Sequence, residues 1–370
     1  MEVLHILIFF CFSAVTESNQ KSLCVLDDWL GDQPERGTHI VCLQGSSAQV
    51  YPHGDKNLDF SVSDVSGSKE LLKAVFRVVK RISQIKFAEK GLTYRNQLPA
   101  IYSAAGKRNP GKLDDGVYLI FEGGLWRWPP IRIGHTRELE SSTLITMSVR
   151  PAVFQVVVNE QWFQTLSDDV LPAAQPLFHK SVTGDLNEAD RTDDNIRSSE
   201  TAWLSYKRSA ELTKQEALTQ NMVRVPLNRF ESNMQVVRYT PGTFYDSHRD
   251  YWDPREFPKS QWTDREGRWH NRFATVLWYL SSPSEGGETW FPRARGEDIP
   301  WGEWRACDDR GTKVQATNGT AVLFYSLLAT GELDEYSWHC GCPVKGKNVK
   351  IAANSWIWSG LFRSGHSDEL

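Results

Sequence analysis

The second half of the chain consists of short apolar runs separated by turn-rich segments, and this pattern limits the fold most. Two helix-like segments, over residues 159–170 and 210–222, lie before most of these runs. The runs of strand length cover residues 154–158, 234–239, 272–280, 320–325 and 351–358. Mostly early helices and late strands predict an α+β fold with helices packed on one side of a β-sandwich or barrel.

Composition excludes several classes of protein. The chain has 370 residues, of which 40% are hydrophobic and 24% are charged, and this is ordinary globular usage. The length allows two to three domains. The 42 Lys and Arg residues nearly balance the 46 Asp and Glu residues, so we expect neither a nucleic-acid partner nor a membrane partner.

The first part of the chain discloses little about function. Residues 69–89 have apolar residues at helical spacing, among them Leu72, Val75 and Val79, which predicts an amphipathic helix. Before residue 150 the sequence contains no nucleotide, metal or nucleophile motif and no internal repeat. We therefore expect a separate N-terminal domain of unknown role over residues 19–150, followed by a second domain over residues 151–362.

The two ends of the chain predict its location. Residues 4–15 form an apolar run followed by small and polar residues, and this run is shorter than the ~20 residues that span a bilayer. A signal peptide over residues 1–18 is the favoured interpretation, and a buried N-terminal strand is the alternative. Residues 367–370 read SDEL, a variant of the ER-retrieval signal. The signal peptide and the retrieval tail together predict a protein of the ER lumen. The sequence also contains one N-glycosylation sequon, at Asn318.

An oxidising lumen favours disulfides, and five cysteines remain after the signal peptide. Cys24 and Cys42 form a natural local pair, and Cys307 with Cys342 is the second predicted pair. An odd number leaves at least one thiol unpaired within the chain. A zinc site is less favoured, because Cys340 and Cys342 lack CxxC spacing and no second pair accompanies them.

Two histidines and one carboxylate form the candidate reactive centre. His248 and Asp250 are two residues apart, so on a strand their side chains share a face. With His339 downstream, they make the set of two His and one carboxylate that holds Fe(II) and leaves positions open for further ligands. The alternative is a solvated turn that Asp250 caps, with His339 an unrelated surface residue.

The residues around this set occur in five ordered blocks. They read RYTPGTFYDSHRD (238–250), RFATVLWYL (272–280), EGGETWFP (285–292), GTAVLFY (319–325) and SWHCGCPV (337–344). Together they closely resemble the prolyl 4-hydroxylase family of 2-oxoglutarate- and Fe(II)-dependent dioxygenases. The resemblance is specific over about residues 230–360, is weaker back to about residue 150, where residues 195–204 take part, and does not reach residues 20–150. It implies a double-stranded β-helix (jelly-roll) core over residues 234–360.

The resemblance also implies roles for individual residues. His248, Asp250 and His339 match the iron ligands. Tyr239 and Thr289 match positions that hold the distal carboxylate of 2-oxoglutarate, whose cationic partner would be a lysine.

The sequence departs from the family pattern at this lysine. The family places it ten residues after the distal histidine, whereas Lys350 lies eleven after His339 and Lys347 is the rival. We favour Lys350, because Lys350 and Trp356 keep the family's six-residue spacing. At period two they also share one face of a strand.

Three further residues match positions near the peptide substrate, namely Tyr245, Arg272 and Trp356. The alternatives are that the aromatic residues belong to the core and that Arg272 is a surface cation. The resemblance further implies that the segment over residues 251–270 is a mobile loop that closes on substrate.

The resemblance and the predicted compartment together imply 4-hydroxylation of prolyl residues in secretory-pathway proteins or peptides. The reaction would use Fe(II), 2-oxoglutarate and O2, with L-ascorbate to rescue oxidised iron. The resemblance further implies that the N-terminal domain could bind either peptide or an ER partner subunit such as a disulfide isomerase, and no helical repeat supports peptide binding there. The alternatives are hydroxylation of another residue type such as lysine, oxygenation of a small molecule, and a non-catalytic ER binding or folding subunit.

Overall fold

The computed structural model describes residues 24–80, 98–182, 193–256, 270–297, 299 and 307–362. The predicted signal peptide, the SDEL tail, most of the predicted mobile loop and the end of the helix predicted over residues 69–89 lie outside these residues. Within them, no helix is both long and apolar enough to cross a bilayer.

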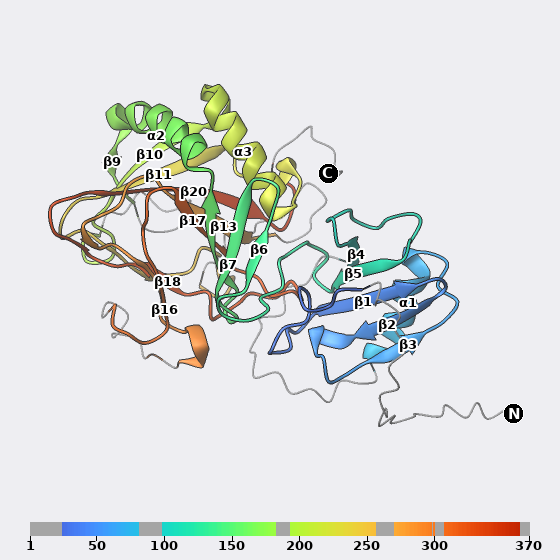
Figure 1. Cartoon of the computed structure of the whole chain (residues 1–370). Coiled ribbons are helices and arrows are strands. Elements are labelled where there is room, and N and C mark those ends of the chain that lie inside the picture. Colours follow the sequence, from blue (N-terminus) through green and yellow to red (C-terminus); the bar gives the residue numbers. More distant parts are fainter. Residues whose placement is uncertain are drawn as a thin grey trace, which may run out of the picture.

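The N-terminal part forms an antiparallel sheet of five strands in the order β3-β2-β1-β5-β4, drawn in blue and teal in Figure 1. Its strands are β1 (Thr38–Gln44), β2 (Ser47–Tyr51), β3 (Phe60–Val62), β4 (Ala100–Ser103) and β5 (Gly116–Phe121). Helix α1 (Ser68–Val79) packs Leu71, Val75 and Val79 against this sheet. The helical periodicity seen in the sequence therefore produces this buried face, although Leu71 is its buried residue and the predicted Leu72 is only partly buried.

A nine-stranded antiparallel sheet forms the centre of the molecule, in the order β6-β7-β8-β17-β13-β20-β11-β10-β9. Its strands are β6 (Thr136–Glu138), β7 (Ser142–Ser148), β8 (Val153–Val158), β9 (His179–Lys180), β10 (Glu200–Ser205), β11 (Asn233–Tyr239), β13 (Arg272–Tyr279), β17 (Thr320–Tyr325) and β20 (Lys350–Trp358).

Helices α2 (Glu160–Ala174) and α3 (Ala210–Val223) lie on one side of this sheet (Figure 1). Each helix begins at a side-chain cap, where Asn159 accepts from the backbone N–H of Trp162 and Ser209 accepts from that of Leu212. Phe163 of α2 lies 6.3 Å from the ring of Trp278 on β13, centroid to centroid. The predicted α+β class with helices on one side is confirmed.

A small sheet lies against the other side of the large one, in the order β12-β18-β15-β16. Its strands are β12 (Tyr245–His248), β18 (His339–Gly341), β15 (Thr289–Phe291) and β16 (Thr312–Val314), and a separate pair joins β14 (Glu285–Gly286) to β19 (Val344–Lys345). Phe291 of the small sheet packs edge-on against Phe324 of the large sheet, with ring centroids 5.2 Å apart. The two sheets thus form a sandwich that shares one core.

Packing is continuous across the boundary predicted at residue 150. β6 and β7 precede that residue, yet they extend the nine-stranded sheet through pairing of β7 with β8. Trp126 and Trp128 belong to the same buried cluster as Phe154 and Tyr325. The structure therefore does not confirm a separate N-terminal domain, because its apolar face is buried against the second half of the chain. The limits 19–150 and 151–362 stay predictions.

Candidate active site

The two histidines and the aspartate predicted as ligands meet at one end of the small sheet. His248 ends β12 and lies directly opposite His339, the first residue of β18. Asp250 follows two residues after His248, and its Oδ1 lies 3.7 Å from His248 Nε2 and 3.8 Å from His339 Nε2. The three donor atoms therefore face a common point, as a metal site requires.

Backbone carbonyls orient both imidazole rings. The Nδ1 of His248 lies 2.8 Å from the carbonyl oxygen of Asp246, and the Nδ1 of His339 lies 3.0 Å from that of Ser337. A carbonyl can only accept, so each neutral ring carries its proton on Nδ1. Each Nε2 then presents a lone pair to the shared point, which is the arrangement found in metal-binding histidines.

Asp250 is held by two donors on its other oxygen. Oδ2 accepts from the Thr275 hydroxyl at 2.6 Å and from the Trp356 indole N–H at 3.1 Å. Burial alone would raise the pKa of Asp250, but the neighbouring histidines, Arg272 and the Thr275 hydrogen bond lower it overall. Oδ1 is therefore an ionised acceptor that faces the two imidazoles.

The pKa of His248 is lowered, first by burial and then by the nearby His339. At neutral pH His248 is therefore a neutral imidazole beside an ionised carboxylate, and the geometry above makes its Nε2 a donor atom. Two imidazoles and one carboxylate are the donor set of non-haem Fe(II) sites. The residues present fit Fe(II).

Lys350 is a buried cation in the same cavity. Lys350 is the first residue of β20 and is only 2% exposed. Burial lowers its pKa to about 8. The structure shows no ion pair between Lys350 and a carboxylate of the described residues, and its Nζ lies 5.0 Å from the ring centroid of Tyr239. A buried ammonium requires an anionic partner, so the geometry leaves room for a carboxylate that a ligand brings.

The structure separates the two candidate lysines. Lys347 is exposed in the connection between β19 and β20, where its backbone N–H donates to Ser284 Oγ at 3.3 Å. Lys350 instead lies opposite Tyr239 where β20 pairs with β11. Thr289 is also buried and accepts from the Tyr279 hydroxyl at 2.8 Å.

One cavity of about 460 Å³ is lined by all nine site residues predicted from the sequence, namely the three iron ligands, the three cosubstrate residues and the three substrate residues. Tyr245 stacks on His248 with ring centroids 3.6 Å apart and planes 18° apart. The Arg272 guanidinium lies 3.4 Å from the ring centroid of Trp356 and forms a 2.8 Å ion pair with Glu231. Trp356 thus contacts both Arg272 and Asp250. The sequence did not predict that one residue would contact both of them.

Sequence reasoning also missed Arg197 and Glu231, which line the cavity. The Arg197 guanidinium lies 4.4 Å from the ring centroid of Tyr245, and its Nε donates to Ser199 Oγ at 3.0 Å. Arg197 stands in the block over residues 195–204, and that position was the available signal. Glu231 accepts from Arg272 and from the Trp358 indole N–H at 3.1 Å, and no motif indicated it.

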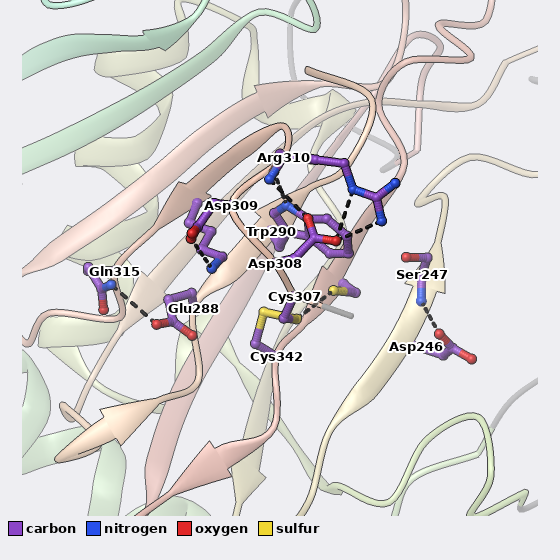
Figure 2. The surroundings of a disulfide bond; sticks show 12 residues. Asp246, Ser247, Glu288, Trp290, Cys307, Asp308, Asp309, Arg310, Gln315 and Cys342 are labelled. Atoms are coloured by element: carbon purple, nitrogen blue, oxygen red, sulfur yellow. Dashed lines mark hydrogen bonds and ion pairs between the residues drawn. A yellow bond between two sulfur atoms is a disulfide. The ribbon is translucent and has the colours of Figure 1, made fainter. Parts of the chain in front are cut away.

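Cys307, Cys340 and Cys342 lie close together, and Cys340 directly follows His339 in β18. Figure 2 shows the surroundings of the Cys307–Cys342 disulfide in this cluster. Both predicted disulfides, Cys24–Cys42 and Cys307–Cys342, are present. Cys340 is the free thiol among the described residues, and its Sγ lies 3.6 Å from that of Cys307. Two of the three sulfurs are already bonded to each other, so the cluster does not offer a zinc site.

Comparison with known proteins agrees with this geometry. Residues 234–358 match the sequence model of the 2OG-Fe(II) oxygenase superfamily. The fold and the site thus define a 2-oxoglutarate- and Fe(II)-dependent oxygenase, and the enzyme is prolyl 4-hydroxylase-like.

Several similar proteins come from Arabidopsis thaliana. Probable prolyl 4-hydroxylase 10 is 26% identical over 261 residues, which cover 65% of this chain and 87% of that protein. Probable prolyl 4-hydroxylase 8 is 32% identical over 193 residues, which cover 51% of this chain and 63% of that protein. Against the second relative, therefore, the match spans less than two thirds of the relative's length.

Among solved structures, the viral collagen prolyl hydroxylase from Paramecium Bursaria Chlorella virus-1 is similar. Its 2-oxoglutarate complex is 25% identical in sequence, with a TM-score of 0.36, and the match covers 56% of this chain and 95% of that one.

Proposed function

We propose that this protein 4-hydroxylates prolyl residues of proteins or peptides, with Fe(II), 2-oxoglutarate and O2, on a double-stranded β-helix core. One observation carries the proposal: the triad, arranged to bind a metal, shares one cavity with a buried lysine that forms no ion pair with a carboxylate of the described residues. Relatives named as prolyl 4-hydroxylases support the choice of residue.

The triad of His248, Asp250 and His339 and the buried Lys350 would bind different groups. His248, Asp250 and His339 would hold Fe(II) through Nε2, Oδ1 and Nε2, and Lys350 would pair with the distal carboxylate of 2-oxoglutarate. Tyr239 and Thr289 would add polar contacts to that carboxylate. Bound Fe(II) with its cosubstrate supplies the oxidation of an unactivated C–H bond. The chain orients the ligands and excludes water.

The substrate side of the cavity suits a proline-containing chain. Tyr245 and Trp356 supply aromatic surface, and the Arg272–Glu231 pair supplies a donor and an acceptor. Extended proline-rich segments bind grooves lined by aromatic rings, because the segment loses little entropy. A prolyl peptide is therefore the substrate that these side chains favour.

We place this reaction in the ER lumen. Two disulfides suit an oxidising compartment, and Asn318 of the glycosylation sequon is exposed. The predicted signal peptide and SDEL tail support the same location. L-Ascorbate as reductant and an ER partner subunit complete the proposal.

Succinate formation tests the proposed function. Purified protein receives Fe(II), ascorbate and 2-oxoglutarate, with no peptide, a proline-rich peptide or a lysine-rich peptide, and Asp250→Ala serves as the inactive control. We expect the proline-rich peptide to stimulate succinate formation and to gain one oxygen on proline by mass spectrometry. Stimulation by the lysine-rich peptide alone would favour the lysyl alternative. Bound iron without any turnover would favour a non-catalytic subunit.

A further inference from the structure

The connection between β17 and β18 is buried, although connections normally lie on the surface. Residues 326–330 are all buried, and the segment folds into a small hairpin. Leu327 and Leu333 form its bridge, the backbone N–H of Leu328 donates to Glu332 O at 2.8 Å, and that of Gly331 donates to Leu328 O at 2.8 Å. We call residues 327–333 the hairpin.

The N-terminal part of the chain covers the tip of this hairpin. The backbone N–H of Gly123 donates to Ala329 O at 2.7 Å. A Cβ added at Gly123 would lie 2.5 Å from the backbone nitrogen of Gly331, a distance that real Cβ atoms essentially never show. The two backbones thus touch, and glycine at position 123 permits this contact.

Two arginines of the N-terminal part hold the hairpin on either side of its tip. Arg127 is 2% exposed, donates to Leu327 O at 2.8 Å and forms a 2.7 Å ion pair with Glu35. Arg36 forms a 3.0 Å ion pair with Glu332. The bonds of the buried Arg127 are charge-assisted, and such bonds are stronger and more specific in geometry than neutral ones.

A short chain of hydrogen bonds connects the hairpin to His339. The backbone N–H of Asp334 donates to Ser326 O at 2.9 Å, and the hydroxyl of Ser337 donates to Asp334 O at 2.8 Å. The carbonyl of Ser337 is the group that faces His339 Nδ1 at 3.0 Å. The position of this carbonyl sets the orientation of the imidazole.

We propose that the N-terminal part of the chain positions His339 through the hairpin, with Gly123 and Arg127 as positioning residues. The proposal rests on the proposed function only in taking His339 as a metal ligand. It gives residues 24–131 a role in the metal site, although none of the triad comes from them. Displacement of the hairpin would turn the His339 ring and leave the other two ligands in place.

Gly123→Ala tests the proposal in the full-length protein, and Gly111→Ala is its matched control. Neither glycine has a left-handed backbone, and a Cβ at Gly111 would meet nothing within 4 Å. The readout is titration with Co(II), followed by its visible ligand-field absorption. We expect Gly123→Ala to weaken Co(II) binding about tenfold, as loss of an outer contact to a metal ligand typically does, and to change the band shape. Gly111→Ala should change neither.

A double-mutant comparison separates positioning from general destabilisation. In a His339→Ala background, Gly123→Ala should cause no further loss of Co(II) affinity, whereas in a His248→Ala background its effect should persist. Equal losses in both backgrounds, or wild-type affinity and spectrum in a Gly123→Ala protein with a lowered Tm, would overturn the proposal. Because no peptide is present, a wrong substrate assignment would leave these results unchanged.

Discussion

At the residue scale, two clusters of histidine and carboxylate differ in which nitrogen of the imidazole ring accepts a hydrogen bond or faces one of the protein's carbonyls. His39, His53 and Glu122 also lie within metal-binding distance of one another. There the backbone N–H of His53 donates to His39 Nδ1 at 3.2 Å, and that of Gly37 donates to His53 Nδ1 at 3.1 Å. Each neutral ring must then carry its proton on Nε2, so this cluster is a hydrogen-bonded network and not a metal site.

The contrast predicts one metal ion per chain. After dialysis, His53→Gln should leave the iron or cobalt content at one equivalent, and His248→Ala should lower it well below one equivalent while weak binding remains measurable by titration, because of these two clusters only the second presents unprotonated Nε2 atoms. Elemental analysis after dialysis measures both. A second equivalent that His53→Gln abolishes would contradict this assignment.

The buried Lys350 predicts a strong asymmetry between two lysines. Lys350→Ala should raise the KM for 2-oxoglutarate by about 10- to 100-fold, since a charge-assisted bond to a ligand carboxylate is lost. Lys347→Ala, in the exposed connection, should stay within about twofold of wild type. Initial rates of succinate formation measure both, and equal effects would contradict the choice of Lys350.

The lowered pKa of Lys350 also predicts a pH dependence. In the free enzyme this pKa is about 8, so above that pH the ammonium loses the proton that anion binding requires. We expect 2-oxoglutarate affinity to fall as pH rises through 8. Lys350→Arg should move the fall to higher pH, because guanidinium stays charged. A fall at the same pH in Lys350→Arg would assign the dependence to another group.

At the same scale, sequence spacing predicted which residues lie close together, but not by the expected geometry. The spacing of His248 and Asp250 predicted a shared strand face, whereas β12 ends at His248 and Asp250 lies beyond the strand. Both side chains nevertheless line one cavity with His339. The support of Asp250 could not be predicted in this way. Thr275 and Trp356 lie opposite each other on β13 and β20, and this pairing depends on sheet register, which the sequence does not specify locally.

At the element scale, the long strands were predictable and the short ones were not. The runs over residues 234–239 and 320–325 correspond to β11 and β17 within one residue. β12, β15 and β18 have only three or four residues each, too few to show a period. These short strands nevertheless carry His248, Thr289 and His339, so the site depends on elements with the weakest local signal.

The Cys307–Cys342 disulfide next to β18 predicts that Cys307 can change its disulfide partner. Cys342→Ser leaves Cys307 without its partner, and the nearest thiol is Cys340, 3.6 Å away. We expect a Cys307–Cys340 disulfide to form in this variant under oxidising conditions, which peptide mapping by mass spectrometry detects. Cys340→Ala, the control, should keep the Cys307–Cys342 bond. Recovery of only free thiols from Cys342→Ser would contradict the expectation.

At the scale of the whole molecule, one buried cluster joins the N-terminal sheet to the nine-stranded sheet. The sequence could not predict this continuity, because part of the contact is made between the backbones of Gly123 and Gly331. Glycines carry no hydrophobic pattern, and the arginines beside them resemble surface residues in a sequence. The role of the N-terminal part is therefore visible only in the assembled structure.

The continuous core predicts a single cooperative unfolding transition for the chain. Calorimetry should show one peak, and metal at about 100 times its Kd should stabilise the folded state by about 2.7 kcal/mol. Asp250→Ala should remove the shift in Tm caused by the metal. Two peaks, of which only one responds to metal, would instead indicate independent domains.

The stacking of Tyr245 on His248 also has a spectroscopic consequence. A tyrosine ring whose centroid lies 3.6 Å from that of an imidazole shields the imidazole protons by its ring current. The carbon-bound protons of His248 should therefore resonate upfield of their usual position, and Tyr245→Leu should return them. Each event that reaches this ligand, whether metal entry, cosubstrate binding or arrival of a peptide, would then be recorded by one resolved resonance in a zinc-substituted protein.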